Sequence, residues 1–136
     1  MGLRKVFISH SGRDTWVAKQ ISREIKDCGA DFFLDEAAVE VGDDFDEKIL
    51  EFLEVADELV VLFTPWGLER PFVWAEIGAA WGRRIPIICV LHGIAVEELQ
   101  ARPSFPVFLK KRDMIDINDL NQYFEQLRAR VARDQS

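Results

Sequence analysis

Cysteine, histidine and long apolar runs are scarce in this chain of 136 residues. Its two histidines and its two cysteines, Cys28 and Cys89, do not have the spacing of a metal site, and we expect both cysteines to be reduced, buried thiols. The strongly apolar stretch at residues 85–91 is far shorter than the roughly 20 residues that cross a membrane. The first residues also lack the apolar stretch of a signal peptide. These absences predict a cytoplasmic chain with no metal site, no bound cofactor and no membrane partner.

Basic residues are in the minority, with 17 lysines and arginines against 24 aspartates and glutamates, a net charge of −7. Nucleic-acid backbones are bound by concentrated basic faces, and the sequence has no such cluster, so we exclude nucleic acid as the main partner. Apolar residues make up 49% and charged residues 30%, as in a folded globular protein. The length predicts one domain over residues 1–136.

Two common nucleotide-binding motifs are missing. No Gly-x-Gly-x-x-Gly follows the first apolar run, and no Walker-type Gly-Lys-Ser/Thr occurs. A phospho-acceptor receiver domain would need an acidic pair after its first strand and an aspartate after its third. This chain has Ser9-His10 and Thr64-Pro65 at those places. The acidic group at residues 43–47 lacks a calcium-loop glycine and is typical of a helix N-terminus.

Short apolar runs alternate with helical periodicities along the whole sequence. We expect strands near residues 6–8, 32–34, 59–63, 85–91 and 114–117, and helices near 15–28, 45–56, 73–81, 96–100 and 120–131. This alternation predicts an α/β domain, a flavodoxin-like three-layer sandwich with a five-stranded parallel sheet in the order 2-1-3-4-5. Such sheets bind ligands at the carboxyl ends of the first and third strands, so the residues that follow those strands are candidates.

Glu76 is the most informative residue of the expected third helix. It lies beside an apolar stripe, about 40° from Ala80, with Phe72 one turn before it. The stripe is formed by Val73, Ile77, Ala80 and Trp81. Partial desolvation there raises a carboxyl pKa and suits the group to acid-base or electrostatic work. The alternative is a boundary glutamate that reaches water.

Three short motifs occur in order along nearly the whole chain. They are FISHS at residues 7–11, FLD at 33–35 followed by VGD at 41–43, and FVWAEIGAA at 72–80. Together they resemble the TIR (Toll/interleukin-1 receptor) domain family, in its bacterial branch. Many members of that family cleave NAD+ at the nicotinamide–ribose bond. The resemblance therefore implies an NAD+ glycohydrolase, with NAD+ as substrate and ADP-ribose or cyclic ADP-ribose as product.

The resemblance also implies that Glu76 is the catalytic residue, because the family's glutamate lies on the helix after the third strand. The usual pattern has a small residue six places before this glutamate and a tryptophan four places before it. Here those places hold Arg70 and Phe72. We expect Phe72 to supply the aromatic wall of the substrate site. Arg70 either contacts the substrate diphosphate or points to solvent, and we expect the solvent orientation.

Polar residues after the first two expected strands complete the candidate site. Ser9, His10 and Ser11 can donate hydrogen bonds to a phosphate or ribose; the alternative is that they cap the loop before the first helix. Asp35 is expected to border the pocket. The segment Asp35–Asp43 corresponds to the family's BB loop, which implies self-association with other TIR domains through this loop.

One carboxylate suffices for the implied reaction. Nicotinamide leaves as a neutral molecule, so no general acid is needed, and Glu76 can stabilise the oxocarbenium character that develops on the ribose. We therefore expect a defence or signalling effector that is activated by self-association. Two alternatives remain open: a TIR module without catalysis that acts by association, and an enzyme like the nucleoside deoxyribosyltransferases, which use a glutamate nucleophile.

Overall fold

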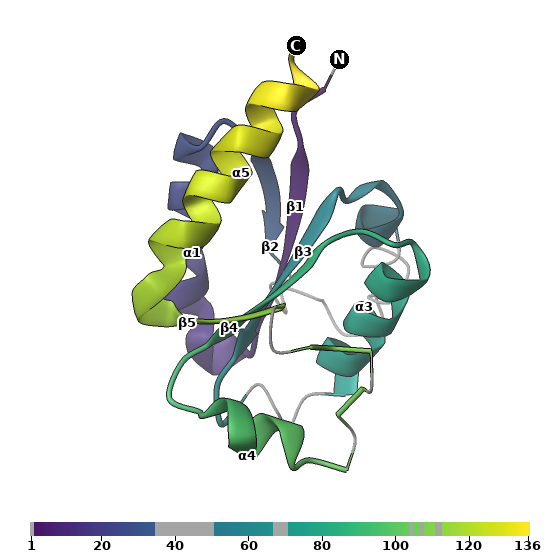
Figure 1. Cartoon of the computed structure of the whole chain (residues 1–136), viewed down its shortest axis with the longest axis vertical. Coiled ribbons are helices and arrows are strands. Elements are labelled where there is room, and N and C mark those ends of the chain that lie inside the picture. Colours follow the sequence, from purple (N-terminus) through teal and green to yellow (C-terminus); the bar gives the residue numbers. More distant parts are fainter. Residues whose placement is uncertain (1, 35–50, 67–70, 104, 107, 111–112) are drawn as a thin grey trace.

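A five-stranded parallel sheet organises the computed structural model, which describes residues 2–34, 51–66, 71–103, 105–106, 108–110 and 113–136. The strands are β1 (Lys5–Ser9), β2 (Asp31–Leu34), β3 (Glu58–Phe63), β4 (Ile87–Leu91) and β5 (Met114–Asp116). Their order in the sheet is β2-β1-β3-β4-β5, and every neighbouring pair is parallel (Figure 1). The predicted fold class and strand order are confirmed.

Helices cover both faces of this sheet (Figure 1). They are α1 (Thr15–Asp27), α3 (Pro71–Gly82), α4 (Val96–Gln100) and α5 (Leu120–Asp134), with 3-10 turns η1 (Gly12–Asp14) and η4 (Ile117–Asp119). Residues 51–55 are also helical, and the rest of the helix expected at 45–56 lies outside the described residues. Within the described ranges, none of the helices combines the length and apolarity needed to cross a membrane.

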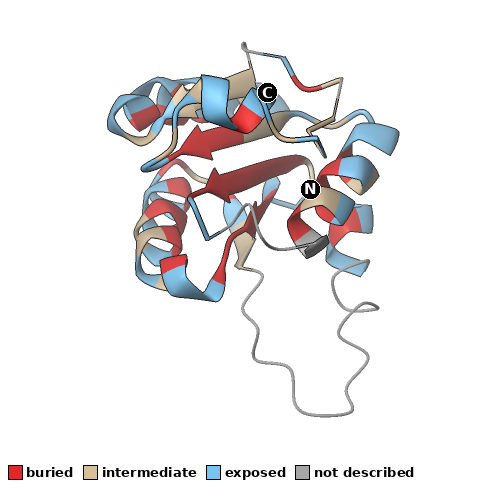
Figure 2. Cartoon of the chain, turned by 90° about the horizontal axis from the view of Figure 1, so that it is seen from below, coloured by how far each residue is buried: buried red, intermediate tan, exposed pale blue. Residues whose placement is uncertain are grey.

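The two faces of β3 divide the core into two clusters. Val60 and Leu62 pack under α1 and α5, whereas Leu59, Val61 and Phe63 pack under α3. This division follows from the alternation of side chains along a strand. All six residues of β3 are buried, and the central strands are red in Figure 2. An apolar strand of this kind is what a parallel sheet covered on both faces requires.

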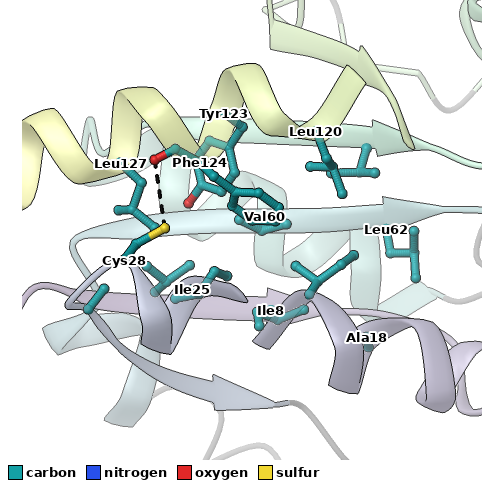
Figure 3. Packing of buried hydrophobic residues seen from close by; sticks show 14 of the residues in the cluster. Ile8, Ala18, Ile25, Cys28, Val60, Leu62, Leu120, Tyr123, Phe124 and Leu127 are labelled. Carbon is teal, nitrogen blue, oxygen red and sulfur yellow. Dashed lines mark hydrogen bonds between the residues drawn. The ribbon is translucent and has the colours of Figure 1, made fainter. Parts of the chain in front are cut away.

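Figure 3 shows the cluster under α1 and α5, in which Phe124 and Leu127 of α5 and Ile25 of α1 point into the same core. Cys28 lies in this cluster, and its Sγ donates to the Phe124 carbonyl at 3.7 Å. Cys89 is buried in the opposite cluster. Neither cysteine forms a disulfide, as predicted, and burial raises the pKa of each thiol.

Two helices end in the same hydrogen-bond pattern. After α1, Gly29 adopts φ +93° and the Ala30 N–H donates to the Ile25 carbonyl. After α3, Arg84 adopts φ +59° and the Ile85 N–H donates to the Ala80 carbonyl. These are Schellman ends, in which glycine is the preferred left-handed residue. The sequence predicted the stop at Gly29 and gave no such signal at Arg84.

A buried carboxylate lies at the amino end of β3. Glu58 is fully buried, and its Oε2 accepts from Nε of both Arg4 and Arg130 at 2.5 Å. Its Oε1 accepts from the Tyr123 hydroxyl at 3.0 Å and from Nη2 of Arg130 at 2.9 Å. Arg4 also pairs with Asp134 at 3.2 Å. This network, which we call the Glu58 clasp, joins the segment before β1, the start of β3 and helix α5.

Two local expectations differ from the structure. Trp81 is 56% exposed and does not belong to the core; its ring stacks on Phe108 at a centroid distance of 4.6 Å. The fourth strand begins at Ile87, two residues later than expected. Pro86 precedes it and has no N–H to donate, although its carbonyl accepts from the Leu59 N–H at 2.9 Å.

Candidate active site

Buried polar side chains gather at the carboxyl edge of the sheet. Among the described residues eight polar or charged side chains are buried, and only Ser22 and Glu58 lie elsewhere. The other six are Ser9, His10, Ser11, Asp14, Thr64 and Glu76. They come from the end of β1, the turn before α1, the end of β3 and the helix α3. Burying polar groups is costly, so such a concentration at the switch point of an α/β sheet indicates a functional site.

Ser9 and Glu76 meet at the centre of this edge. The Ser9 hydroxyl donates to Glu76 Oε1 at 3.2 Å, and the exposed fractions of the two residues are 0% and 1%. Ser9 lies two residues after Phe7, so strand alternation turns it toward the face that α3 covers. Glu76 lies three residues after Val73 and four before Ala80, both fully buried, and its own burial places it on the inward side of α3.

The expected boundary position of Glu76 is therefore wrong, because the carboxylate is fully buried. The helical stripe placed it at the rim of the apolar surface. What the stripe could not show is that Ser9, at the end of β1, provides a buried hydroxyl donor. A polar partner below the helix allows the carboxylate to point inward, where an apolar surface would have turned it to water.

His10 and Ser11 follow Ser9 in the same loop and are also buried, with exposed fractions of 1% and 6%. Ser11 precedes η1, and its Oγ accepts from the Arg13 N–H at 3.3 Å. The expected alternative of loop capping is thus seen for Ser11. Contact of His10 and Ser11 with a substrate stays a prediction.

A second buried pair lies on the other face of the sheet. The Thr64 hydroxyl donates to Asp14 Oδ2 at 2.5 Å, with exposed fractions of 0% and 4%. Nearby, the Arg13 guanidinium lies over the exposed ring of Trp66, at 5.8 Å from its centroid. Both contacts connect the turn before α1 with the segment after β3.

Several predicted site residues cannot be placed in this arrangement. Asp35, the Asp35–Asp43 loop and Arg70 lie outside the described residues. Phe72 is in the first turn of α3, and its side chain also lies outside the description. Their expected roles stay predictions. Among the described residues, no three His, Cys, Asp or Glu side chains are grouped to hold a metal ion.

Sequence reasoning did not select Asp14, and it placed Thr64 only among the residues that follow the third strand, without naming its partner. Asp14 looks like an ordinary helix-capping aspartate before α1, and Thr64 is one of several polar residues after β3. Fifty positions separate them in the chain, so no local pattern connects them. The only available signal was that both follow strands at the expected ligand-binding edge.

A groove of about 810 Å³ lies elsewhere, between α1 and α5. Trp16 and His92 line it, and neither Ser9 nor Glu76 does. It is lined by side chains of both helices and contains none of the buried polar pairs. The carboxyl edge, with its buried carboxylate and hydroxyl, is therefore the better candidate for a catalytic site.

Comparison with known proteins gives a consistent picture. A family model described as TIR domain matches residues 6–131. The TIR domain of the Toll-related receptor TRR-2 from Hydra magnipapillata is 19% identical, with a TM-score of 0.66 over 95% of each chain. The TIR domains of the activated Roq1 resistosome, which directly recognises the pathogen effector XopQ, are 13% identical, with a TM-score of 0.64 over 98% of this chain and 99% of that one.

A further solved structure, of an enzyme, shares the fold. The Clostridium botulinum CMP N-glycosidase BcmB is 17% identical, with a TM-score of 0.52 over 91% of this chain and 98% of that one. No curated protein sequence matches the chain. At these identities the solved structures show a shared fold.

Proposed function

Because the chain belongs to the TIR domain family, we propose that it cleaves NAD+ at the bond between nicotinamide and ribose, with Glu76 as the catalytic residue. The observation that carries the proposal is the position of Glu76: a buried carboxylate, oriented by the Ser9 hydroxyl at 3.2 Å, at the carboxyl edge of the sheet. An electrostatic stabiliser is most effective when it is fixed and withdrawn from water in this way.

The reaction requires little proton chemistry. The bond from the ribose C1′ to the pyridinium nitrogen breaks, and its electron pair neutralises the ring, so nicotinamide leaves uncharged. Positive charge develops on the ribose, where the Glu76 carboxylate stabilises it or holds the ribose hydroxyls. A water oxygen then bonds to C1′ and releases a proton, which gives ADP-ribose. Attack by a ring nitrogen of the adenine within the same molecule gives a cyclic product.

Substrate binding requires the carboxyl edge to open. Glu76 is 1% exposed, so its carboxylate cannot meet a ribose until neighbouring groups move aside. Ser9 keeps its role in the complex by fixing one carboxylate oxygen while the other faces the sugar. His10 and Ser11 are the proposed donors to phosphate or ribose, Asp35 borders the pocket and Phe72 provides its aromatic wall.

Self-association is the second element of the proposal. We assign it to the Asp35–Asp43 loop, as the family resemblance implies, and we place the activity in signalling or defence in the cytoplasm. The specific activity should then rise with protein concentration across two decades. A constant specific activity over that range would contradict association-dependent catalysis and leave the role of Glu76 standing.

Two other functions use the same residues differently. In a TIR module without catalysis, the buried Ser9–Glu76 pair would only hold α3 against the sheet. In an enzyme acting on nucleosides or simple nucleotides, Glu76 would be a nucleophile at C1′. The shared fold with a CMP N-glycosidase favours this candidate over an unrelated chemistry, because both reactions break an N-glycosidic bond.

One set of incubations separates the three functions. The purified chain is mixed in parallel with NAD+, with CMP, and with a deoxynucleoside plus a different free nucleobase. The released bases are quantified by chromatography. Release of nicotinamide, with no reaction in the other two arms, supports the proposal. Release of cytosine or base exchange supports the nucleosidase or transferase function. No release in any arm, at high protein concentration, supports the association module.

A further inference from the structure

Asp14 departs from the usual behaviour of an aspartate at a helix N-terminus. It occupies the N-cap of α1, where such a side chain normally accepts a hydrogen bond from the first turn of its own helix. Its carboxylate makes no such bond. It turns inward and accepts from the Thr64 hydroxyl, with both residues buried. The chain therefore gives up a local cap for a contact 50 positions away.

This contact fixes the two segments from which the Ser9–Glu76 pair is built. Asp14 lies five residues after Ser9, at the end of the loop that leaves β1. Thr64 is the first residue after β3 and begins the connection to α3, which carries Glu76. The Asp14–Thr64 bond thus joins the end of the first connection to the start of the second.

The two pairs lie on opposite faces of the sheet edge. Phe63 belongs to the cluster under α3, and the next residue, Thr64, reaches Asp14 before α1. The cation–π contact between Arg13 and Trp66 joins the same two segments. Arg13 directly precedes Asp14, and Trp66 lies two residues after Thr64. Thr64 directly follows β3, and Val61 of β3 pairs with Ser9 of β1, so a shift at Thr64 would reach Ser9 through the paired strands.

We propose that Asp14 and Thr64 are positioning residues, which act through the carboxyl ends of β1 and β3 to set the Ser9–Glu76 geometry for the cleavage reaction. The inference rests on the proposed function. It extends the site to the opposite face of the sheet. Misplacement of a catalytic group by a fraction of an ångström changes turnover more than ground-state binding.

Three substitutions test the pair. Asp14→Asn keeps an acceptor oxygen and removes the charge, Thr64→Val removes the hydroxyl at nearly constant volume, and Thr64→Ser retains it. We expect Asp14→Asn and Thr64→Val each to lower kcat for NAD+ cleavage by about tenfold, with KM changed less than about twofold. Thr64→Ser should restore most of the turnover. The double variant should lose little more than Thr64→Val alone, because both substitutions act on the same hydrogen bond.

Ser22→Ala is the matched control. Ser22 is equally buried, at 3% exposed, and its hydroxyl donates to the Lys19 carbonyl within α1, away from the site. This variant reports the effect of removing a buried polar group without a connection to Glu76. Its kcat should equal that of the parent. If Asp14→Asn or Thr64→Val folds and also keeps the parental kcat, the positioning role is wrong.

A second readout does not depend on turnover. The ¹³C chemical shift of the Glu76 side-chain carboxyl, followed by NMR, reports its hydrogen bond to Ser9 directly. It should move in Thr64→Val and Asp14→Asn and stay at the parental value in Ser22→Ala. An unchanged shift in folded Thr64→Val would overturn the inference. If the parent releases no nicotinamide, the proposed function fails, and this measurement still decides whether the pair positions Glu76.

Discussion

The hydroxyl of Ser9 lies 3.2 Å from the carboxylate of Glu76, although 67 positions separate the two residues in the chain. One ends the first strand and the other lies in the middle of the helix that follows the third strand. Their contact crosses the switch point of the sheet, where the chain turns to opposite faces after β1 and β3.

Replacing Glu76 should abolish NAD+ cleavage without unfolding the domain. Glu76→Gln keeps the volume and an acceptor for Ser9 but removes the charge, so we expect turnover to fall at least about a hundredfold, the effect of removing one electrostatic stabiliser. Glu76→Ala should lose as much activity and also some stability, since it leaves a buried void. Nicotinamide release and thermal melts measure both effects. Glu51→Gln, on an exposed residue, is the control.

Ser9→Ala should lower turnover more than it raises KM. A hydrogen bond to a charged group contributes about 1.5–3 kcal/mol, which corresponds to roughly ten- to a hundredfold in rate if the bond is needed in the transition state. Steady-state kinetics with NAD+ measure the split. A rise in KM at unchanged kcat would instead assign Ser9 to substrate binding alone.

Glu58→Gln should destabilise the fold and leave the specific activity of the folded protein unchanged. Removing one partner of a buried ion pair costs about 3–5 kcal/mol, because the remaining arginines lose their counter-charge. Urea denaturation measures this difference. Asp134→Asn is the matched control, since its pair with Arg4 is partly exposed and contributes less than about 1 kcal/mol. Equal losses from both variants would contradict the central place of Glu58 in the clasp.

The two Schellman ends should respond in opposite directions to substitution. Arg84→Gly relieves a left-handed backbone at an exposed position, and we expect a gain of about 1 kcal/mol in the free energy of unfolding. Gly29→Ala should destabilise, because its φ is +93° and the new Cβ would lie 3.2 Å from Val131 Cγ1. Denaturant titrations of the two variants give the signs. A loss of stability in Arg84→Gly would show that the arginine side chain outweighs the backbone strain.

The sequence predicted the layers and the strand order because these depend on periodicity, which is local. β3 is apolar throughout and α5 has a clear helical stripe, so each element was recognised without its partners. Family resemblance then selected Glu76. Periodicity alone placed this residue at a rim, since a stripe records the apolar neighbours of a helix and not the single hydroxyl that Ser9 places beneath it.

Contacts between distant segments account for the structural features that the sequence did not predict. The Asp14–Thr64 pair and the clasp around Glu58 each depend on residues 50 or more positions apart, and each of these residues has an ordinary local explanation. Trp81 was assigned to the core by its position on the α3 stripe, and its stacking on Phe108 is invisible to a helical projection. Local patterns predict elements, whereas buried polar pairs depend on their assembly.

The ion pair of Arg4 with Asp134 brings together positions 130 apart in the chain, and Figure 1 shows the two ends side by side. They meet at the amino end of β3, whose six residues place the candidate site roughly 20 Å away. A short glycine-serine bridge could therefore join residue 136 to residue 2 while new ends are opened in a surface turn. Such a circularly permuted chain should retain the sheet, and a tether or label attached near residue 2 or residue 136 would leave the carboxyl edge unobstructed.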